Sequence, residues 1–599
     1  MLRALSHRGP DGSGIAIRDT AILGNARLAI TDLREDAALP WSRRNDPSGA
    51  CLAYNGALLN GADLRARLIG HEFRSSSDAE VVFAWLSKYG AAGVSDLVGH
   101  FSLAFFDPHG RSFLARDLYG PRPLFYVIHR GALYFGSELK ALVQVPGISV
   151  QPNISGLADF LTLAYIPGEQ TAFENIWELE AGHILYIDEL TPWRFADHHF
   201  DEVTDLSFDE AVGQVRDAMV RSVADAVDVD APIGSTLSGG IDTSSIVCMA
   251  ARHIPKLKTY SIRMGEKSFD ESVYQRMVAK HVGAQHREIT VGPEDVLKRW
   301  SETVQALDEP LGDGAAIPSY ILADIASQEV KVLLSGEGGD EVFNAYETHG
   351  AALFRSGYRR WVPGAIRTVV SRLVHQLPVR HHKLSFDFVA RRIVDGCEMD
   401  VCAAHVHWRH CLPPNYREGI FPGFVPERPE RWFEKTFDRV RAHSDIDRIS
   451  AVDLEHFLVG DLMVKNDRTF MAHGIEGRFP WLDQRLGRLM RTMPHRWRIR
   501  SVLERRFLEK KAIEPFVPKQ ILRRTNMGLE MPHSGWFKGP WRPWLESMLH
   551  RDRVRQLSWL NPVMVEEIMG LHLANKQDYG RLLWCLCNLV EWHEQYIQG

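Results

Sequence analysis

A short stretch with two glycines, an acid and several hydroxyls constrains the fold of this chain more than any other feature. In residues 232–247 an apolar run ends in Ser238-Gly239-Gly240, and Asp242-Thr243-Ser244-Ser245 follows where a helix is predicted (residues 245–253). Glycine permits positive φ angles and close backbone approach. The unpaired amides of a first helical turn, with the helix dipole, favour an anion there. The stretch therefore predicts a phosphate-binding strand-to-helix turn in an α/β domain.

The polar side chains of this turn suit a diphosphate with a metal ion. Ser238, Thr243 and Ser244 can donate hydrogen bonds to phosphate oxygens. Asp242 would repel a bare phosphate, so we interpret it as a ligand of Mg²⁺, which prefers carboxylate and phosphate oxygens. The structural alternative is a glycine-rich turn that ends a buried strand, but glycines, acid and hydroxyls all fall at this one turn.

The spacing differs from the Walker loop, whose Gly-x-x-x-x-Gly-Lys-Ser/Thr pattern is absent. It resembles the Ser-Gly-Gly-x-Asp-Ser pyrophosphate loop of the ATP-pyrophosphatase families, which split ATP to AMP and pyrophosphate. Thr243 replaces the usual serine after the aspartate and keeps the hydroxyl.

Bulk properties narrow the class of protein. The 599 residues allow two large domains or three to four smaller ones. With 70 basic and 76 acidic residues and no basic stripe, we expect no nucleic acid partner. No apolar run approaches the length of a membrane span and no signal-peptide pattern opens the chain, so we expect a cytoplasmic protein without a membrane partner. Seven cysteines fit reduced thiols.

One segment invites a metal interpretation. Cys397, Cys402 and Cys411 lie among three histidines, but the paired Cys-x-x-Cys spacing of structural zinc sites is absent. We expect ordinary helix residues there.

The first 200 residues combine short strands with two helices. Turn residues punctuate predicted strands at 14–17, 21–23, 50–54, 102–106, 112–115, 124–129 and 132–135. Helices are predicted at 62–68 and 79–89. Two sheets with helices outside would bury these strands.

Several motifs follow in a fixed order through this region. They are His7-Arg8-Gly9-Pro10-Asp11, residues 23–30, Tyr54-Asn55-Gly56, Ser77-Asp78-Ala79-Glu80 and Ala115-Arg116-Asp117. Their order resembles the glutaminase domain of class II glutamine amidotransferases of the asparagine synthetase type. The resemblance implies a four-layer αββα sandwich over residues 1–200, with the family's first strand and the amino-terminal stretch before residue 7 mostly missing. It also implies that Arg27 holds the glutamine carboxylate, Asn55 and the Gly56 amide form an oxyanion hole, and Asp78 takes the ammonium.

This region departs from the family pattern in two ways. The family nucleophile is a cysteine directly after the initiator Met, whereas residue 2 is Leu and the nearest cysteine is Cys51. The acid expected after Asn-Gly is Ala57, so one partner of the glutamine ammonium is lost. From these residues we expect no thiolate attack on glutamine by the chain as it stands.

The second half predicts a parallel sheet. A capping box at Ser207 and Glu210 opens an amphipathic helix to about residue 226. Strands at 257–264, 286–291 and 330–334 then alternate with helices, which places ligands at the carboxyl ends of the strands. The last strand runs into Ser335-Gly-Glu-Gly-Gly-Asp-Glu341. Its carboxylates would complete the magnesium site and handle a proton or position the nucleophile.

Together with residues 308–310, 316–318 and 465–483, these segments resemble the synthetase domain of the asparagine synthetase family, here assigned to residues 205–599. The resemblance implies a nucleotide site, a metal site and a reaction centre. The adenine would lie against the backbone of Leu237 and Ile262. The remaining assignments are Ser238, Gly239, Gly240, Thr243, Ser244, Ser335 and Gly336 for nucleotide and pyrophosphate, Asp242 and Asp340 for Mg²⁺, and Glu337, Lys465 and Arg468 for catalysis.

A third departure concerns a lysine that the family carries in an Arg-x-Lys-x-Gly-Phe stretch. Asn526 occupies that position in Arg524-Thr-Asn-Met-Gly528, and a neutral amide supplies no positive charge. This bears on which acid and which nucleophile the site accepts.

The predicted function is ATP-dependent amide formation through an acyl-adenylate, in the family's main activity the amidation of aspartate with ammonia from glutamine. One alternative is an intramolecular amide-forming cyclase that acts on a precursor peptide or amino-acid derivative, as in relatives that make lasso peptides or β-lactams, with a silent glutaminase domain. A non-catalytic scaffold is the second. Whether the chain forms a homodimer stays open.

Overall fold

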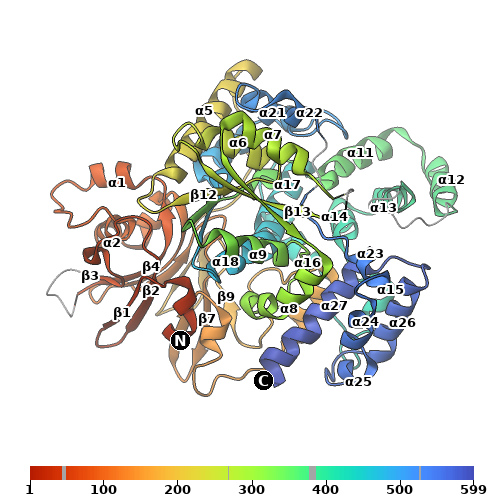
Figure 1. The fold of residues 1–599 in the computed structure, drawn as a ribbon, viewed down its shortest axis with the longest axis horizontal. Helices are drawn as coiled ribbons and strands as arrows, with labels where there is room; N and C mark the ends of the chain where they lie inside the picture. The colour runs from red at the N-terminus through yellow and green to blue at the C-terminus, as the bar shows by residue number, and fades with distance from the viewer. Residues whose placement is uncertain (43–48, 267–268, 377–385, 525–527, 599) are drawn as a thin grey trace.

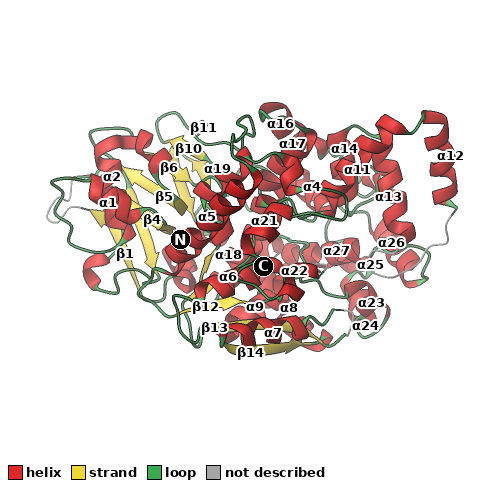
Figure 2. Cartoon of the chain, turned by 90° about the horizontal axis from the view of Figure 1, so that it is seen from above, coloured by secondary structure: helices red, strands yellow, loops and turns green. Residues whose placement is uncertain are grey.

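The structure is a computed structural model that describes residues 1–42, 49–266, 269–376, 386–524 and 528–598. Two parts follow one another along the chain (Figure 1): antiparallel sheets come first, and a parallel sheet surrounded by helices comes second. Figure 2 shows the strands gathered at one end and along one side, with helices in the remainder. Within the described ranges, no helix is both long and apolar enough to cross a membrane. The predicted α/β and α+β class is thus confirmed.

A six-stranded antiparallel sheet, β11-β10-β6-β5-β4-β3, forms the centre of the amino-terminal part. Side chains alternate across it, so Leu52 of β4 packs against Val82 of α2 on one face, whereas Ala53 packs toward Leu23 of β2 on the other. The strands are β1 (Gly12–Ile17), β2 (Ile22–Arg27), β3 (Trp41–Ser42), β4 (Cys51–Leu58), β5 (Gly99–Phe106), β6 (Phe113–Arg116), β7 (Phe125–His129), β8 (Ala132–Gly136), β9 (Trp177–Glu178), β10 (His183–Tyr186) and β11 (Pro192–Arg194).

Smaller elements complete this part. The β1–β2 hairpin and the β8-β7-β9 sheet lie on the face of the large sheet opposite α2. The seven predicted strands and both predicted helices are present with shifted ends, whereas the short strands β3, β9, β10 and β11 were not predicted. The helices, with η for 3₁₀ and π helices, are η1 (Leu2–Arg8), η2 (Glu35–Ala37), α1 (Gly61–Arg67), α2 (Asp78–Tyr89), η3 (Gly90–Asp96), α3 (Leu139–Leu142) and α4 (Ile154–Leu163).

The second part is organised by a five-stranded sheet in which every pair of neighbouring strands is parallel. Its order is β14 (Gln285–Val291), β13 (Lys258–Met264), β12 (Ile233–Thr236), β15 (Val332–Leu334) and β16 (Glu476–Arg478). The predicted parallel sheet is confirmed, and β16 is an addition. Because β12 and β15 are neighbours, the segments that follow them emerge side by side at one edge.

Helices surround this sheet and extend away from it (Figures 1 and 2). The predicted capping box of α5 is present, with Ser207 and Glu210 bonded reciprocally. The first group is α5 (Phe208–Val227), α6 (Ile241–Ala250), α7 (Ser272–Val282), α8 (Pro293–Leu307), α9 (Ala316–Ala326), α10 (Gly339–Val342), α11 (Glu347–Trp361), α12 (Gly364–His375), α13 (Phe386–Glu398), α14 (Val401–Arg409), α15 (Pro414–Arg417), α16 (Glu430–Arg439) and α17 (Asp445–Val452).

The helical segment from residue 445 to 471 is composite, because α17 runs into a π-helix, η4 (Asp453–Met463), before α18 begins. π-Helices are rare and often occur at functional sites. The remaining helices are α18 (Val464–Met471), η5 (Pro480–Leu482), α19 (Gln484–Thr492), α20 (His495–Arg498), α21 (Phe507–Ile513), α22 (Lys519–Arg523), α23 (His533–Lys538), α24 (Arg542–Met548), α25 (Arg551–Val554), α26 (Pro562–Leu573), α27 (Gly580–His593) and η6 (Glu594–Gln598).

Buried ion pairs join the two parts. The Arg8 guanidinium donates to Glu138 Oε1 at 2.7 Å and to both carboxylate oxygens of Asp467 at 2.7 and 2.9 Å. Lys331 Nζ lies 2.7 Å from Asp11 Oδ1 across the same boundary, in a more exposed position. The parts are therefore packed as one body around charges that solvent does not screen.

Candidate active site

The loop after β12 has the geometry of an anion site. Gly239 adopts a φ of +77°, and a Cβ there would lie 2.9 Å from the Tyr274 Cβ. The Thr243 hydroxyl lies 2.9 Å from Ser238 Oγ, and the Gly240 amide donates to Ser238 Oγ at 3.2 Å. Residue 240 caps α6 without a side-chain hydrogen bond. Ser244 Oγ is buried and, within the described residues, has no hydrogen-bond partner. An oxyanion at this helix start would give Ser244 Oγ a partner.

Asp242 and Asp340 converge on one cation. The Arg506 guanidinium donates to Asp242 Oδ1 at 2.7 Å and also pairs with Asp340, and Glu509 lies 3.3 Å from it. Burial lowers the pKa of Arg506, but Asp242 and Glu509 outweigh that and raise it. Two carboxylates that hold one guanidinium are close enough to share a divalent ion with phosphate oxygens. The donor set therefore fits Mg²⁺.

Glycines bring the two strand ends together. A Cβ on Gly339 would lie 1.9 Å from Asp242 Oδ1, and one on Gly336 would lie 2.9 Å from the Asp242 Cβ. The β15 loop therefore lies directly against the first turn of α6, which the predicted sheet implied. Arg506, by contrast, was missed, because it follows Asp340 by 166 residues and carries no local motif.

Glu337 and Lys465 lie next to this edge. Ser335 Oγ donates to Glu337, and Lys465 Nζ lies 3.7 Å from Glu337 Oε1. Lys465 Nζ also donates to Asp313 Oδ2 at 2.8 Å, and this contact was not predicted. Burial alone would lower the pKa of Lys465, but Asp313 and Glu337 raise it, so the ammonium is charged. The site thus contains the Glu337 carboxylate and, next to it, the Lys465 ammonium, whose position Asp313 fixes.

Arg468 has a different environment from the one we expected. Its guanidinium donates to the Ser137 carbonyl at 2.9 Å and lies 3.2 Å from Asp467 and 3.7 Å from Asp308. It belongs to the ion pairs that join the two parts of the chain. Within the described residues, the polar contacts of Arg468 are with these boundary groups, and none is with Glu337.

The predicted adenine contacts are backbone groups on two neighbouring strands. The Leu237 amide donates to the Tyr260 carbonyl at 2.9 Å, and the Leu237 carbonyl accepts from the Ser261 hydroxyl. The Ile262 carbonyl accepts from Gln275 Nε2 at 3.0 Å. Both residues therefore lie at the β12–β13 edge. Asn526 lies outside the described residues, although nearby Arg524 donates to the Gly239 carbonyl at 2.7 Å.

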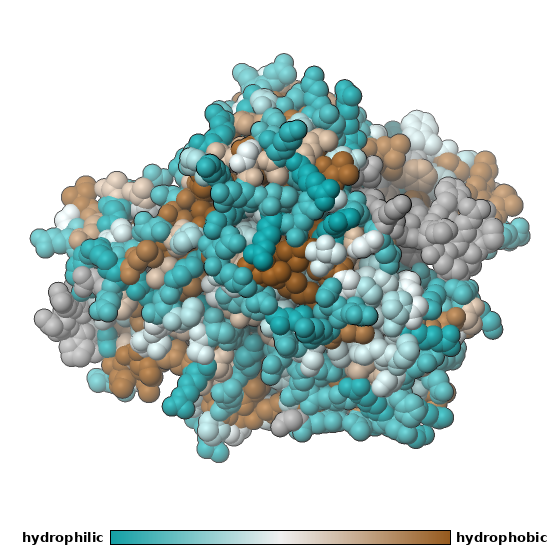
Figure 3. All heavy atoms as spheres, viewed as in Figure 1, coloured by the Kyte–Doolittle hydropathy of each residue, from teal (hydrophilic) through white to brown (hydrophobic). Residues whose placement is uncertain are grey.

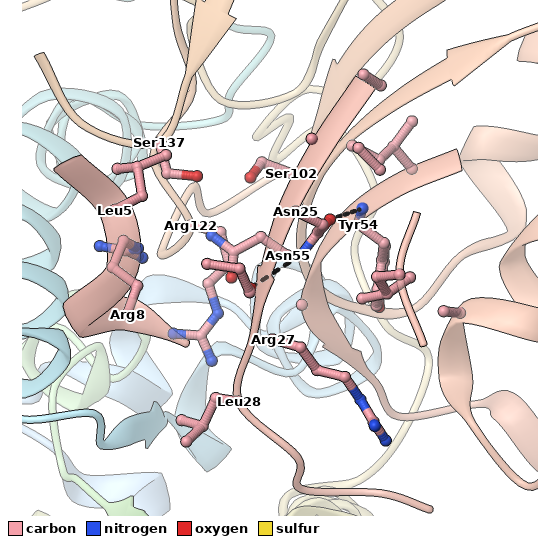
Figure 4. A pocket seen from close by; sticks show the side chains of 18 of the residues that line it. Leu5, Arg8, Asn25, Arg27, Leu28, Tyr54, Asn55, Ser102, Arg122 and Ser137 are labelled. Atoms are coloured by element: carbon pink, nitrogen blue, oxygen red, sulfur yellow. Dashed lines mark hydrogen bonds between the residues drawn. The ribbon is translucent and has the colours of Figure 1, made fainter. Parts of the chain in front are cut away.

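The predicted glutamine residues line a cavity of about 390 Å³ in the amino-terminal part (Figure 4). Asn55 Nδ2 is buried, and the described residues offer it no hydrogen-bond partner. Asp78 Oδ2 accepts from the Leu58 amide at 2.9 Å, and burial raises the pKa of Asp78 to about 6. Gly56 also lines the cavity, whereas neighbouring Ala57 is 1% exposed and its position offers no carboxylate.

Arg27 points away from the other cations of this cavity in Figure 4. Its guanidinium donates to the carbonyls of Asp32 and Arg34 at 2.5 and 3.0 Å. Arg122, which sequence reasoning missed, faces the cavity and donates to the Gly477 carbonyl at 2.9 Å. The cavity therefore reaches the synthetase part of the chain.

The cysteine-rich segment is helical, as expected, with α13 and α14 on either side of Met399. Burial raises the pKa of the Cys402 thiol to about 12. Across the described part of the chain, no group of three or more His, Cys, Asp or Glu residues has the arrangement of a metal site.

Comparisons with known proteins agree with both halves of this description. The asparagine synthase family model matches residues 214–594, and a glutamine amidotransferase domain model matches residues 1–193. Asparagine synthetase (glutamine-hydrolyzing) 1 of Bacillus subtilis is 27% identical over 605 residues, which cover 100% of this chain and 93% of that protein. The amidase chry2 of Gibberella zeae is 24% identical over 622 residues, which cover 96% and 91%.

A putative glutamine-hydrolyzing asparagine synthetase of Mycobacterium bovis is 28% identical over 628 residues, which cover 99% of this chain and 93% of that protein. The matches span both the amidotransferase part and the part that contains Asp242, Glu337 and Asp340. The chain therefore belongs to the asparagine synthase family and is an ATP-dependent ligase that forms carbon–nitrogen bonds.

Proposed function

We propose that this ligase converts the side-chain carboxylate of aspartate to an amide, with Mg²⁺ and ATP, through an acyl-adenylate. One observation carries the proposal: Asp242 and Asp340 meet at a single cation, directly beside the hydroxyl-rich loop. That is the arrangement a metal-bound triphosphate needs at the edge of a parallel sheet.

The residues of the chain have separable roles in this reaction. A carboxylate oxygen of the substrate attacks the α-phosphorus of ATP, the bond to the β-phosphate bridging oxygen breaks, and pyrophosphate leaves toward Ser238, Thr243 and Ser244. Bound Mg²⁺ would supply charge neutralisation on the phosphates, with Asp242 and Asp340 as its protein ligands. Lys465, held by Asp313 at 2.8 Å, places a positive charge beside the reacting groups.

Amide formation follows at the same position. The amine nitrogen attacks the acyl carbon, the bond to the AMP oxygen breaks, and the nitrogen loses a proton. Glu337 lies 3.7 Å from Lys465 and is the carboxylate placed to accept that proton. Leu2 offers no thiolate to release ammonia from glutamine, so free ammonia is the nitrogen donor in this proposal. In the amidotransferase part, glutamine would be held by Arg27, Asn55, Gly56 and Asp78.

A second candidate has a specific observation in its favour. Ala57 leaves the glutamine ammonium without one of the family's acids, and Leu2 offers no thiolate to attack glutamine. An amine within the substrate would then replace ammonia, as in an intramolecular cyclase acting on an amino-acid derivative or a precursor peptide. The ligase chemistry at Asp242, Glu337 and Asp340 would be unchanged.

Pyrophosphate release separates these candidates. The wild-type chain with ATP and Mg²⁺ should release pyrophosphate when aspartate and ammonia are added, and mass spectrometry should show asparagine. Glu337→Gln should lower kcat by about 100-fold or more, while Glu294→Gln, an exposed acid at the start of α8, should leave it unchanged. Release with an amine-bearing acid alone, without ammonia, would favour the cyclase, and no release with any acid would refute adenylation.

A further inference from the structure

One face of the last long helix follows the loop that holds Asp313. Trp592 Nε1 donates to the Asp308 carbonyl at 2.9 Å, and Asn588 Nδ2 donates to the Leu311 carbonyl at 3.0 Å. One turn earlier, a Cβ on Gly312 would lie 2.6 Å from Cys585 Sγ. The helix and the loop therefore run side by side in opposite directions.

Arg581 continues this face by one more turn. Positions 581, 585, 588 and 592 are spaced four, three and four residues apart, which places them on one side of α27. The loop runs from Asp308 beside Trp592 to Gly312 beside Cys585, so the next loop residue, Asp313, lies level with the helix turn that carries Arg581. This places Arg581 beside the Asp313–Lys465 pair. Electrostatic coupling supports this placement: against burial, Arg581 adds to the lowering of the Asp313 pKa that Lys465 causes, and it opposes the rise that burial and Asp313 cause in the pKa of Asp461.

The Arg581 side chain is exposed, whereas Gly580 and Leu582 on either side are buried. No described residue forms a hydrogen bond or an ion pair with it. The neighbouring Cys411 thiol and Asp461 carboxyl raise the pKa of Arg581, so its guanidinium is charged. An exposed guanidinium that no described residue pairs with has its donors free for a ligand.

Protein carboxylates surround Lys465, so this ammonium has little charge left to attract a second carboxylate of the substrate. Asp313 lies 2.8 Å from Lys465 Nζ and Glu337 lies 3.7 Å away, so protein carboxylates already balance that ammonium. Asp461 is four residues before Lys465 and only 2% exposed. An acid with a second carboxylate would be repelled here unless a further positive group received it.

We propose that Arg581 binds the anionic group of the acid substrate that is not activated, and so selects dicarboxylic acids. The inference rests on the proposed function, because it assumes that adenylation occurs at Glu337 and Lys465. The planar guanidinium can hold a carboxylate with two parallel hydrogen bonds. For aspartate, the bound group would be the α-carboxylate and the activated group the side-chain carboxylate.

The test compares two acids that differ by one carboxylate. Wild type is assayed for pyrophosphate release with aspartate and with β-alanine, which lacks the α-carboxylate. Arg581→Met should raise the KM for aspartate by about 10- to 100-fold and leave kcat and the KM for β-alanine nearly unchanged. Arg581→Lys should be intermediate, because it keeps the charge and loses the fork. Arg542→Met, a surface arginine paired with Glu546, is the matched control.

The outcomes separate this inference from the proposed function. Pyrophosphate release by wild type tests adenylation, whereas the variant tests Arg581. If another acid is activated, the same comparison uses that acid and its analogue without the second anionic group. An unchanged KM in Arg581→Met, an equal loss with both acids, or activation only of acids with one anionic group would overturn the inference.

Discussion

At the scale of single residues, Arg506 is the side chain on which the nucleotide site depends before any ligand arrives. It pairs with Asp242 and Asp340 and lies 3.3 Å from Glu509, from a backbone position with a φ of +59°. Burial raises the pKa of Glu509 to about 8 even so, which shows how strongly this position disfavours uncompensated negative charge.

Replacing Arg506 should therefore destabilise the ligand-free protein. We expect Arg506→Met to lower the free energy of unfolding by about 3–5 kcal/mol, because it leaves buried carboxylates unpaired. Arg505→Met is the control, since Arg505 pairs with exposed Glu347 and should cost less than about 1 kcal/mol. Urea unfolding measures both. Equal effects of the two substitutions would contradict the role given to Arg506.

Asp78 makes a pH-dependent contribution with a definite sign. Its folded pKa, about 6, lies above the unfolded value of about 3.9, so the folded state binds the proton more tightly. Stability from this group is present below about pH 4 and is lost as pH rises to about 6, by up to about 3 kcal/mol.

Asp78→Asn removes this titration. The difference in unfolding free energy between Asp78→Asn and wild type should shift in favour of the variant by up to about 3 kcal/mol between pH 4 and pH 7. Asp63→Asn, an exposed acid on α1, should show no such shift. A pH-independent difference for Asp78→Asn would show that the carboxyl titrates normally.

At the scale of elements, the β12–α6 turn depends on one glycine. Gly239→Ala should lower the stability by about 1–3 kcal/mol, because φ is +77° and the new Cβ would meet Tyr274 and the Gln275 amide. Nucleotide affinity should fall with it. Gly213→Ala in α5 has open space around it and should instead stabilise by about 0.5–1 kcal/mol. Thermal unfolding measures both, and the same sign for the two would contradict the account.

The sequence alone predicted those parts of the site whose functional residues lie within one short stretch of chain. Residues 238–244 carry glycines, acid and hydroxyls within one turn, and residues 335–341 do so at the next strand, so their meeting followed from a parallel sheet. Arg506 and Arg581 were not predictable, because each reaches the site through tertiary packing and neither has a motif. Arg468 shows the converse, since a motif position was assigned to phosphate while distant Ser137 and Asp308 hold the side chain.

At the scale of the whole molecule, a cluster of buried ion pairs fixes the position of the amino-terminal part relative to the synthetase part. Arg8 is 5% exposed and bridges Glu138 to Asp467, two positions separated by more than 300 residues. The outer surface is mostly hydrophilic on the face in Figure 3, with one apolar patch near its centre and others toward its edges. The relative position of the two parts therefore depends on interior contacts such as the Arg8 ion pairs.

Replacing Arg8 should weaken the contact between the two parts of the chain. We expect Arg8→Met to destabilise the protein by about 3–5 kcal/mol, because two buried carboxylates lose their partner. Lys331→Met removes an ion pair across the same boundary, but the pair with Asp11 is partly exposed and should contribute about 1 kcal/mol or less. Proteolysis near residues 201–206 should accelerate only in Arg8→Met. Unchanged proteolysis would mean that other contacts fix the parts.

The central claim is that two strand ends hold one metal-bound nucleotide. Calorimetric titration of the protein with a non-hydrolysable ATP analogue, with and without Mg²⁺, tests it in wild type, Asp242→Asn, Asp340→Asn and the double variant. We predict that each single substitution weakens Mg²⁺-dependent binding by about 10-fold or more, and that the double variant loses little beyond either single one, because both ligands serve one ion. Mg²⁺-dependent binding that survives both substitutions would contradict the account.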